Sequence, residues 1–157
     1  MHLLEQIDRG GRLTPDQPAH ISDGRVLTYG ELLARSDVVA AWLEAELGAS
    51  RTPIAVHGHK EPEMLVAFLG VVKSGRPYVP IDISIPAQRA ARIIANAGAA
   101  LTLTSARVDE IVAAGRTGQP RRGAGDDPFY ILFTSGSTGE PKGVVIRSEE
   151  RRVGKEC

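Results

Sequence analysis

The sequence predicts an α/β fold, because short apolar segments of strand length alternate with segments of helical periodicity. The clearest unit is an apolar strand at residues 53–56, a helix at about 61–74 that stops at Gly75, and a second strand at 77–81. A strand, a helix and a strand within about thirty residues form a βαβ unit. Such units build parallel sheets that are flanked by helices.

The N-terminal region predicts a hairpin followed by a helix. Residues 19–22 and 25–28 flank Asp23-Gly24, a dipeptide typical of two-residue hairpin turns. Thr28 stands three residues before Glu31, which is the spacing of a capping box at a helix N-terminus. Apolar residues then recur at helical spacing as far as Gly48, a natural helix stop.

Further elements follow the βαβ unit. Pro86 is expected at the first position of a helix that ends before Gly98, because proline suits that position. Residues 101–104 predict a strand and residues 105–114 a short helix. Residues 115–127, rich in Gly, Arg and Asp without periodicity, are expected to be a surface linker.

Composition excludes several classes of function. The chain has 19 Lys+Arg and 19 Asp+Glu, so no overall positive charge points to nucleic acid. Its longest apolar run, residues 64–72, is too short for membrane insertion, and the acidic N-terminus does not resemble a signal peptide. The sole cysteine, Cys157, excludes an internal disulfide framework. We therefore expect a cytoplasmic protein.

A loop rich in hydroxyls and glycines, residues 134–143, lies between two apolar segments that we expect to be buried strands, 129–133 and 144–146. Hydroxyls supply hydrogen-bond donors, glycines let backbone N–H groups approach a phosphate, and a lysine adds charge. A flexible linker is the alternative, but strong strand formers adjoin the loop on both sides. The candidate phosphate-binding residues are Thr134, Ser135, Gly136, Ser137, Thr138, Gly139 and Lys142.

The loop fits neither of the common nucleotide-binding patterns. A Walker A loop needs Gly-Lys-Ser/Thr at its end, whereas Gly143 follows Lys142 here. The dinucleotide pattern Gly-x-Gly-x-x-Gly is also missing from the sequence.

Residues 130–145 resemble the phosphate-binding signature of the adenylate-forming, or AMP-binding, superfamily. Residues 27–32 and 72–82 are similar to two upstream signatures of members that activate amino acids, and all occur in the expected order. Departures are Ser74, where alanine is usual, and Arg76-Pro77, where small residues are common. The resemblance implies that residues 1–146 are the N-terminal part of an adenylation domain, about its first third.

Within this superfamily, residues 58–64, 68–70 and 82–86 are most similar to D-alanine–D-alanyl carrier protein ligases. The resemblance implies that ATP and Mg²⁺ are used to activate D-alanine as D-alanyl-AMP. The phosphopantetheine thiol of a carrier protein then accepts the alanyl group, for lipoteichoic acid synthesis. The amino-acid pocket, the adenine contacts and a mobile lysine would follow residue 146, so this fragment is expected to bind ATP poorly and to be inactive. Two alternatives remain: a fragment of a peptide synthetase adenylation domain for another amino acid, and a non-catalytic nucleotide-binding fragment.

Other polar residues are weaker candidates. His57 and His59 lack a third metal ligand nearby, so we interpret them as structural and expect no metal site. Asp82 follows a predicted strand and is interpreted as a cap or turn residue. We assign no catalytic residue within this sequence.

Residues 147–157 differ from what precedes them, because charged residues replace the apolar strand abruptly. These residues match a translation of a widely used DNA-sequencing adapter. We therefore expect residues 147–157 to be a non-native tail, without a functional role for Cys157.

Overall fold

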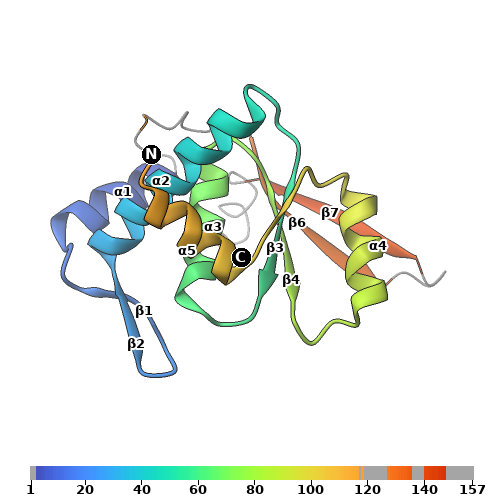
Figure 1. Ribbon diagram of the computed structural model, residues 1–157, viewed down its shortest axis with the longest axis horizontal. Helices are drawn as coiled ribbons and strands as arrows, with labels where there is room; N and C mark the ends of the chain where they lie inside the picture. The colour runs from blue at the N-terminus through green and yellow to red at the C-terminus, as the bar shows by residue number, and fades with distance from the viewer. Residues whose placement is uncertain (1–2, 117, 119–126, 136–139, 148–157) are drawn as a thin grey trace, which may run out of the picture.

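The computed structural model describes residues 3–116, 118, 127–135 and 140–147. In this part of the chain, two strands form a small hairpin and five form a larger sheet of order β5-β3-β4-β6-β7 (Figure 1). The larger sheet is parallel except for β7, which is antiparallel to β6. The strands are β1 (Pro18–Ser22), β2 (Arg25–Thr28), β3 (Ile54–Gly58), β4 (Tyr78–Asp82), β5 (Thr102–Leu103), β6 (Pro128–Ser135) and β7 (Pro141–Arg147).

Helices cover both faces of the sheet, which confirms the predicted α/β class. The helices are α1 (Leu3–Leu13), α2 (Tyr29–Leu47), α3 (Pro62–Lys73), α4 (Ala87–Ala97) and α5 (Ser105–Ala114). Ile54 and Val56 of β3 pack into the core that α2, α3 and α5 share, whereas Ala55 packs with Ile93 of α4. Because successive side chains of a strand point to opposite faces, α4 covers the face opposite the other helices.

The turn, the helix cap and the short helix that local sequence patterns predict are present in the structure. Asp23 and Gly24 both adopt positive φ angles, 49° and 74°, as the β1–β2 turn requires. The Thr28 side chain accepts a hydrogen bond from the Glu31 backbone N–H, and the Glu31 carboxylate accepts one from the Thr28 N–H. The helix at 105–114 was predicted to the residue. Pro86 is an exception by one position, because it is the N-cap and α4 begins at Ala87.

Two buried cations, Lys73 and Arg76, form contacts between different helices or helix ends. Lys73 of α3 is 3% exposed and lies 2.7 Å from Asp37 of α2 and 3.4 Å from Asp8 of α1. Arg76, one of the departures from the family pattern, is 1% exposed and donates to the backbone carbonyls of Ser74 and Gly48. Both buried cations therefore donate hydrogen bonds to oxygen atoms, as buried charges require.

The structure corrects the sequence interpretation in two places. Residues 3–13, for which no helix was predicted, form α1, whose Leu4 packs into the core despite two adjacent glycines in the helix. The second correction concerns β6 and β7. These strands extend through Ser135 and from Pro141, so they include residues that were assigned to the loop. β7 was expected to be buried, yet Val144 and Val145 are 48% and 46% exposed.

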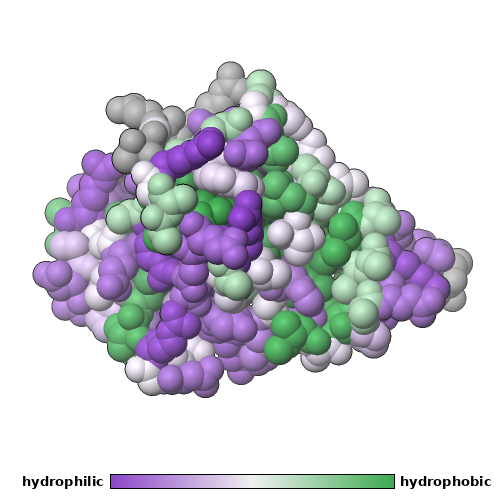
Figure 2. Space-filling model, viewed as in Figure 1, coloured by the Kyte–Doolittle hydropathy of each residue, from purple (hydrophilic) through white to green (hydrophobic). Residues whose placement is uncertain are grey.

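The surface is mixed in character. On the face shown in Figure 2, hydrophilic side chains dominate over α1, α2 and α5, and apolar ones gather in a strip between these helices and α4. None of the helices in the described part of the chain has the length and apolar character that crossing a bilayer would need.

Candidate functional site

The β6–β7 hairpin carries the predicted phosphate loop at its free end. β6 pairs with β4 at Tyr78↔Tyr130, and the hairpin then extends beside α4, away from β3 (Figure 1). Ile131 and Phe133 of β6 pack against the core between α4 and the sheet. A side chain at position 143 would meet both of these residues, at 3.1 and 3.0 Å, so glycine lets β7 lie close to β6 here.

Thr134 and Lys142 are the two candidate residues that the structure places as direct neighbours. They are cross-strand partners in the β6–β7 ladder, and both are exposed. Side chains of such partners start about 5 Å apart on the same face of the sheet. Ser135 ends β6 and pairs with Pro141. Gly136, Ser137, Thr138 and Gly139 lie outside the described residues.

Lys142 places an exposed positive charge near the end of the hairpin, where Glu140 is also exposed. Lys142 forms no ion pair with another described residue, and Thr134 is its cross-strand partner. An ammonium group and a hydroxyl on one exposed sheet face can bind an anionic oxygen without first breaking an internal ion pair.

His59 and Asp82 form a separate cluster where β3 and β4 end. His59 Nδ1 lies 2.6 Å from Asp82 Oδ2, and Asp82 Oδ1 accepts the backbone N–H of Ser84 at 2.9 Å. These hydrogen bonds, from His59 first and then from Ser84, hold the pKa of the Asp82 carboxyl far below its usual value. The turn role predicted for Asp82 is thus confirmed. Asp82 ends β4, whereas Thr134 and Lys142 belong to the β6–β7 hairpin, which pairs with β4 at Tyr78↔Tyr130.

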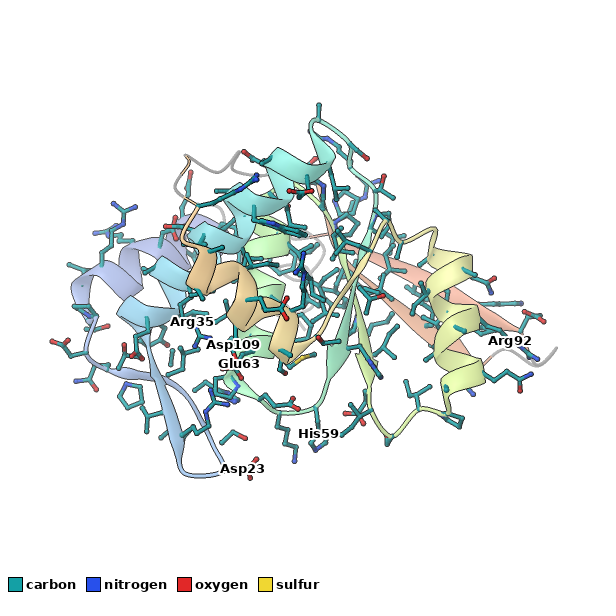
Figure 3. All side chains as sticks on the ribbon, in the orientation of Figure 1. Asp23, Arg35, His59, Glu63, Arg92 and Asp109 are labelled. Atoms are coloured by element: carbon teal, nitrogen blue, oxygen red, sulfur yellow. The ribbon has the colours of Figure 1, made fainter. Side chains whose placement is uncertain are left out.

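A buried carboxylate was missed by sequence reasoning. Glu63 of α3 is 1% exposed and lies 2.5 Å from Arg25 of β2 and 3.3 Å from Arg35 of α2. Arg35 also contacts Asp109 of α5, and Figure 3 shows Arg35, Glu63 and Asp109 converging from three helices. Burial alone would raise the pKa of Glu63, but hydrogen bonds from Arg25 and from backbone N–H lower it overall. Glutamate is mostly exposed in proteins, so the position of Glu63 in the first turn of α3 did not indicate that it would be buried.

The described residues do not form a cage for a metal ion, since no group of three His, Cys, Asp or Glu side chains converges among them. Mg²⁺ is usually held by one or two carboxylates together with substrate phosphates. The carboxylates described above are engaged by Arg25, Arg35 or His59 instead. Glu63 and Asp82, engaged in this way, are therefore not candidates to hold Mg²⁺.

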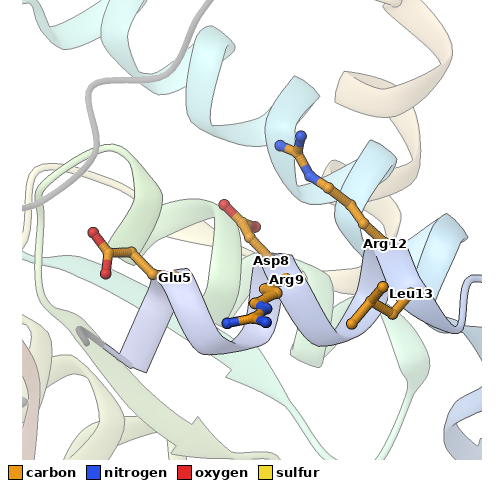
Figure 4. A pocket seen from close by; sticks show the side chains of 5 residues that line it. All are labelled: Glu5, Asp8, Arg9, Arg12 and Leu13. Carbon is orange, nitrogen blue, oxygen red and sulfur yellow. The ribbon is translucent and has the colours of Figure 1, made fainter.

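A hollow along α1 is a poorer candidate than the hairpin (Figure 4). Its lining comes from one helix and combines two acidic with two basic side chains: Glu5, Asp8, Arg9, Arg12 and Leu13. Asp8 is already paired with Lys73. Opposite charges on a single open helix face favour no particular ligand.

Comparison with known proteins identifies the class to which this fold and loop belong. Residues 7–151 match the AMP-binding enzyme family. The chain therefore belongs to the AMP-binding enzyme family, as the resemblance of its motifs implied.

Individual relatives and solved structures show which members of this family the chain resembles. The chain is 44% identical to a D-alanine–D-alanyl carrier protein ligase of Bacillus thuringiensis strain Al Hakam, over 93% of this chain. It spans 32% of the length of that relative. It also resembles the nonribosomal peptide synthetase FmoA3, with a TM-score of 0.84 and 28% identity, covering 98% of this chain and 19% of that one. The N-terminal subdomain of Klebsiella oxytoca NpsA gives a TM-score of 0.81 and 29% identity, covering 94% and 40%.

Proposed function

We propose that the end of the β6–β7 hairpin is the polyphosphate-binding part of an ATP-dependent, AMP-forming ligase. The observation that supports this most is the exposed cross-strand pair of Thr134 and Lys142 beside the glycine-rich segment. Thr134 and Ser135 are the first choices for direct phosphate contact, Gly136, Ser137, Thr138 and Gly139 complete the loop, and Lys142 supplies charge. The family is shown by comparison, and the roles given to these particular residues are our proposal.

In the proposed reaction, the carboxylate of D-alanine attacks the α-phosphate of ATP to give D-alanyl-AMP and pyrophosphate. The thiol of the carrier protein's phosphopantetheine then attacks the alanyl carbonyl of D-alanyl-AMP, which forms the thioester and releases AMP. The residues of this chain would hold the β- and γ-phosphates while negative charge develops on the departing pyrophosphate. Hydroxyl and ammonium groups fixed on paired strands suit that role, because they need little rearrangement during the reaction.

D-Alanine is the proposed amino acid because the ligase relatives are 44% identical, whereas the peptide synthetase structures are 28–30% identical. A peptide synthetase domain for another amino acid is the second candidate, favoured by the TM-score of 0.84 with FmoA3. The setting would be the cytoplasm, and the product would serve lipoteichoic acid D-alanylation. Since this chain covers 32% of the relatives, the activity belongs to the complete gene product.

The test is ATP–pyrophosphate exchange by the complete gene product with a panel of amino acids. We expect exchange with D-alanine well above that with any L-amino acid. Exchange that L-amino acids drive and D-alanine does not would reject the ligase and favour the peptide synthetase reading. A protein that binds ATP but exchanges with no amino acid would favour a non-catalytic nucleotide-binding role.

The boundary between residues 1–146 and 147–157 is part of the same proposal. The first segment carries the family motifs, and the second carries the charged adapter-like sequence. Genomic resequencing across codon 146 checks this. A native reading frame that continues through residues 147–157 into a longer protein would contradict it.

A further inference from the structure

Four aromatic side chains, here called the aromatic row, lie where the β6–β7 hairpin joins the rest of the fold. Phe68 of α3 stacks on Tyr78 of β4 with ring centroids 4.3 Å apart, and Tyr78 stacks on Tyr130 of β6 at 5.5 Å. Phe129 of β6 meets Tyr78 and Tyr130 edge to face, at 6.3 and 6.4 Å. Stacked and edge-to-face pairs of this kind stabilise a contact beyond the area that they bury. The row therefore joins α3 and β4 directly to the first residues of β6.

A β-bulge directs Phe129 to this row. The ladder between β6 and β7 shifts register between Pro128 and Tyr130, which leaves Phe129 as an extra residue in β6. Strict alternation along the strand would place Phe129 on the same face as Ile131 and Phe133. Instead, Ile131 and Phe133 pack with α4, whereas Phe129 packs against the core that α2, α3 and α5 share. Because a bulge can re-aim a side chain, the base of the hairpin contacts the cores on both faces of the sheet.

The row coincides with the step at which the hairpin joins the parallel sheet, since β6 pairs with β4 at Tyr78↔Tyr130. Thr134 stands further along β6, about 13 Å from Tyr130 at roughly 3.3 Å per residue. Over that length, a rotation of the hairpin by about 5° moves Thr134 by about 1 Å. A displacement of about 1 Å can lower a rate about a hundredfold when a group has to meet a transition state. The angle of the hairpin at the row therefore determines whether Thr134 and Lys142 are correctly placed.

We propose that the aromatic row positions the phosphate-binding end of the hairpin, so that Tyr78 and Tyr130 are positioning residues of the AMP-forming ligase. This inference rests on the proposed function of the loop. The rings act through the hairpin: they hold β6 at one angle to β4, while Thr134 and Lys142 contact the phosphates. A flat ring that stacks on another ring admits few orientations, whereas an aliphatic side chain packs there without fixing the angle.

The test compares Y130L with Y130F in ATP–pyrophosphate exchange by the complete gene product. Y130L removes the ring and keeps an apolar side chain. We expect its kcat to fall by about tenfold or more while the KM for ATP changes by less than about threefold, because the displaced loop fails mainly at the transition state. Y130F keeps the ring and should retain the parent kcat within about twofold, because the stacking geometry is unchanged.

Two further variants separate positioning from stability and from the function of the loop. L103A removes a buried side chain from β5, which lies on the other side of β3 from the hairpin, so its kcat should stay near that of the parent while it is folded. T134V/K142M tests the loop itself. If this double variant loses exchange while Y130L keeps it, the row proposal is overturned and the loop assignment stands. If the double variant keeps full exchange, the loop assignment fails, and the row proposal fails with it.

Hydrogen–deuterium exchange gives a readout that needs no activity. In the complete gene product carrying Y130L, the amides of β6 and β7 should exchange about tenfold faster or more, because the base of the hairpin opens more often, while those of β3 keep the parent rates. Y130F should match the parent throughout. Unchanged protection of the hairpin in Y130L, or an equal loss of protection in β3, would overturn the proposal. A kcat as low in Y130F or in L103A as in Y130L would also overturn it, because the ring would then not be what matters.

Discussion

The two halves of the sheet differ in how much of their surface helices cover. In β3, Ile54, Ala55 and Val56 are all 0% exposed, because α3 and its neighbours cover one face and α4 the other. In the β6–β7 hairpin, Leu132, Val144 and Val145 are 43–48% exposed. We therefore infer that the first half supplies most of the stability, and that the second half holds the residues proposed to bind phosphate. Substitutions in the two halves should therefore differ in how much they lower the stability of the fold.

The largest effect should come from two leucines in strands on opposite sides of the sheet. L103A removes a side chain that is 0% exposed and should lower the free energy of unfolding by about 2–5 kcal/mol. L132A removes one that is 43% exposed and should cost less than about 1 kcal/mol. Urea denaturation of both variants measures the difference. Equal losses would mean that the hairpin contributes to the core as much as β5 does.

A smaller effect is expected from the buried carboxylate. E63Q removes the carboxylate charge that Arg25 and Arg35 share, and should cost about 2 kcal/mol at neutral pH. The control E110Q removes a solvent-exposed partner of Arg107 and should cost less than about 0.5 kcal/mol. Urea denaturation at pH 7 compares the two variants.

The same residue predicts a pH dependence. The folded-state pKa of Glu63 lies below its ordinary value of 4.5, so its contribution is complete above pH 4.5 and is lost as pH falls through the lower folded-state value. The stability gap between the parent chain and E63Q should therefore narrow in acid. A gap that stays constant or widens below pH 4.5 would show that the carboxylate's charge is not what stabilises this cluster.

The capping box gives the smallest effect within the covered half. T28A removes the oxygen that accepts the Glu31 N–H and should cost about 1 kcal/mol. T28S keeps that oxygen and should retain most of the stability. Thermal melts of the two variants distinguish the loss of the cap from the loss of a methyl group, and a T28S variant as unstable as T28A would count against the cap.

The parts of the fold that sequence predicted well are those that local chemistry determines. Asp23-Gly24, the Thr28–Glu31 pair and the helix at 105–114 each carry their own signal within a few residues. α1 was missed because Gly10 and Gly11 lower its helix propensity, and its stability comes from Leu4 and from the Asp8–Lys73 pair. Tertiary contacts of this kind leave no local pattern.

In the candidate site, too, the features that depend on tertiary contacts could not be predicted from local sequence. Loop chemistry at 134–142 could be recognised from residue types, but the cross-strand pairing of Thr134 with Lys142 could not, because it depends on how far the hairpin extends. The exposure of β7 was likewise hidden, since an apolar strand has the same sequence pattern whether or not a neighbour covers it. Glu63 was missed for the converse reason, because its arginine partners come from other elements.

The central claim is that the hairpin end binds phosphate while the covered half holds the fold. The most direct measurement is ATP–pyrophosphate exchange by the complete gene product carrying T134V/K142M, together with its melting temperature. The account predicts that exchange falls by about a hundredfold, as expected when groups that stabilise developing charge are lost, with little change in melting temperature. Unchanged exchange, or a loss that occurs only together with unfolding, would contradict it.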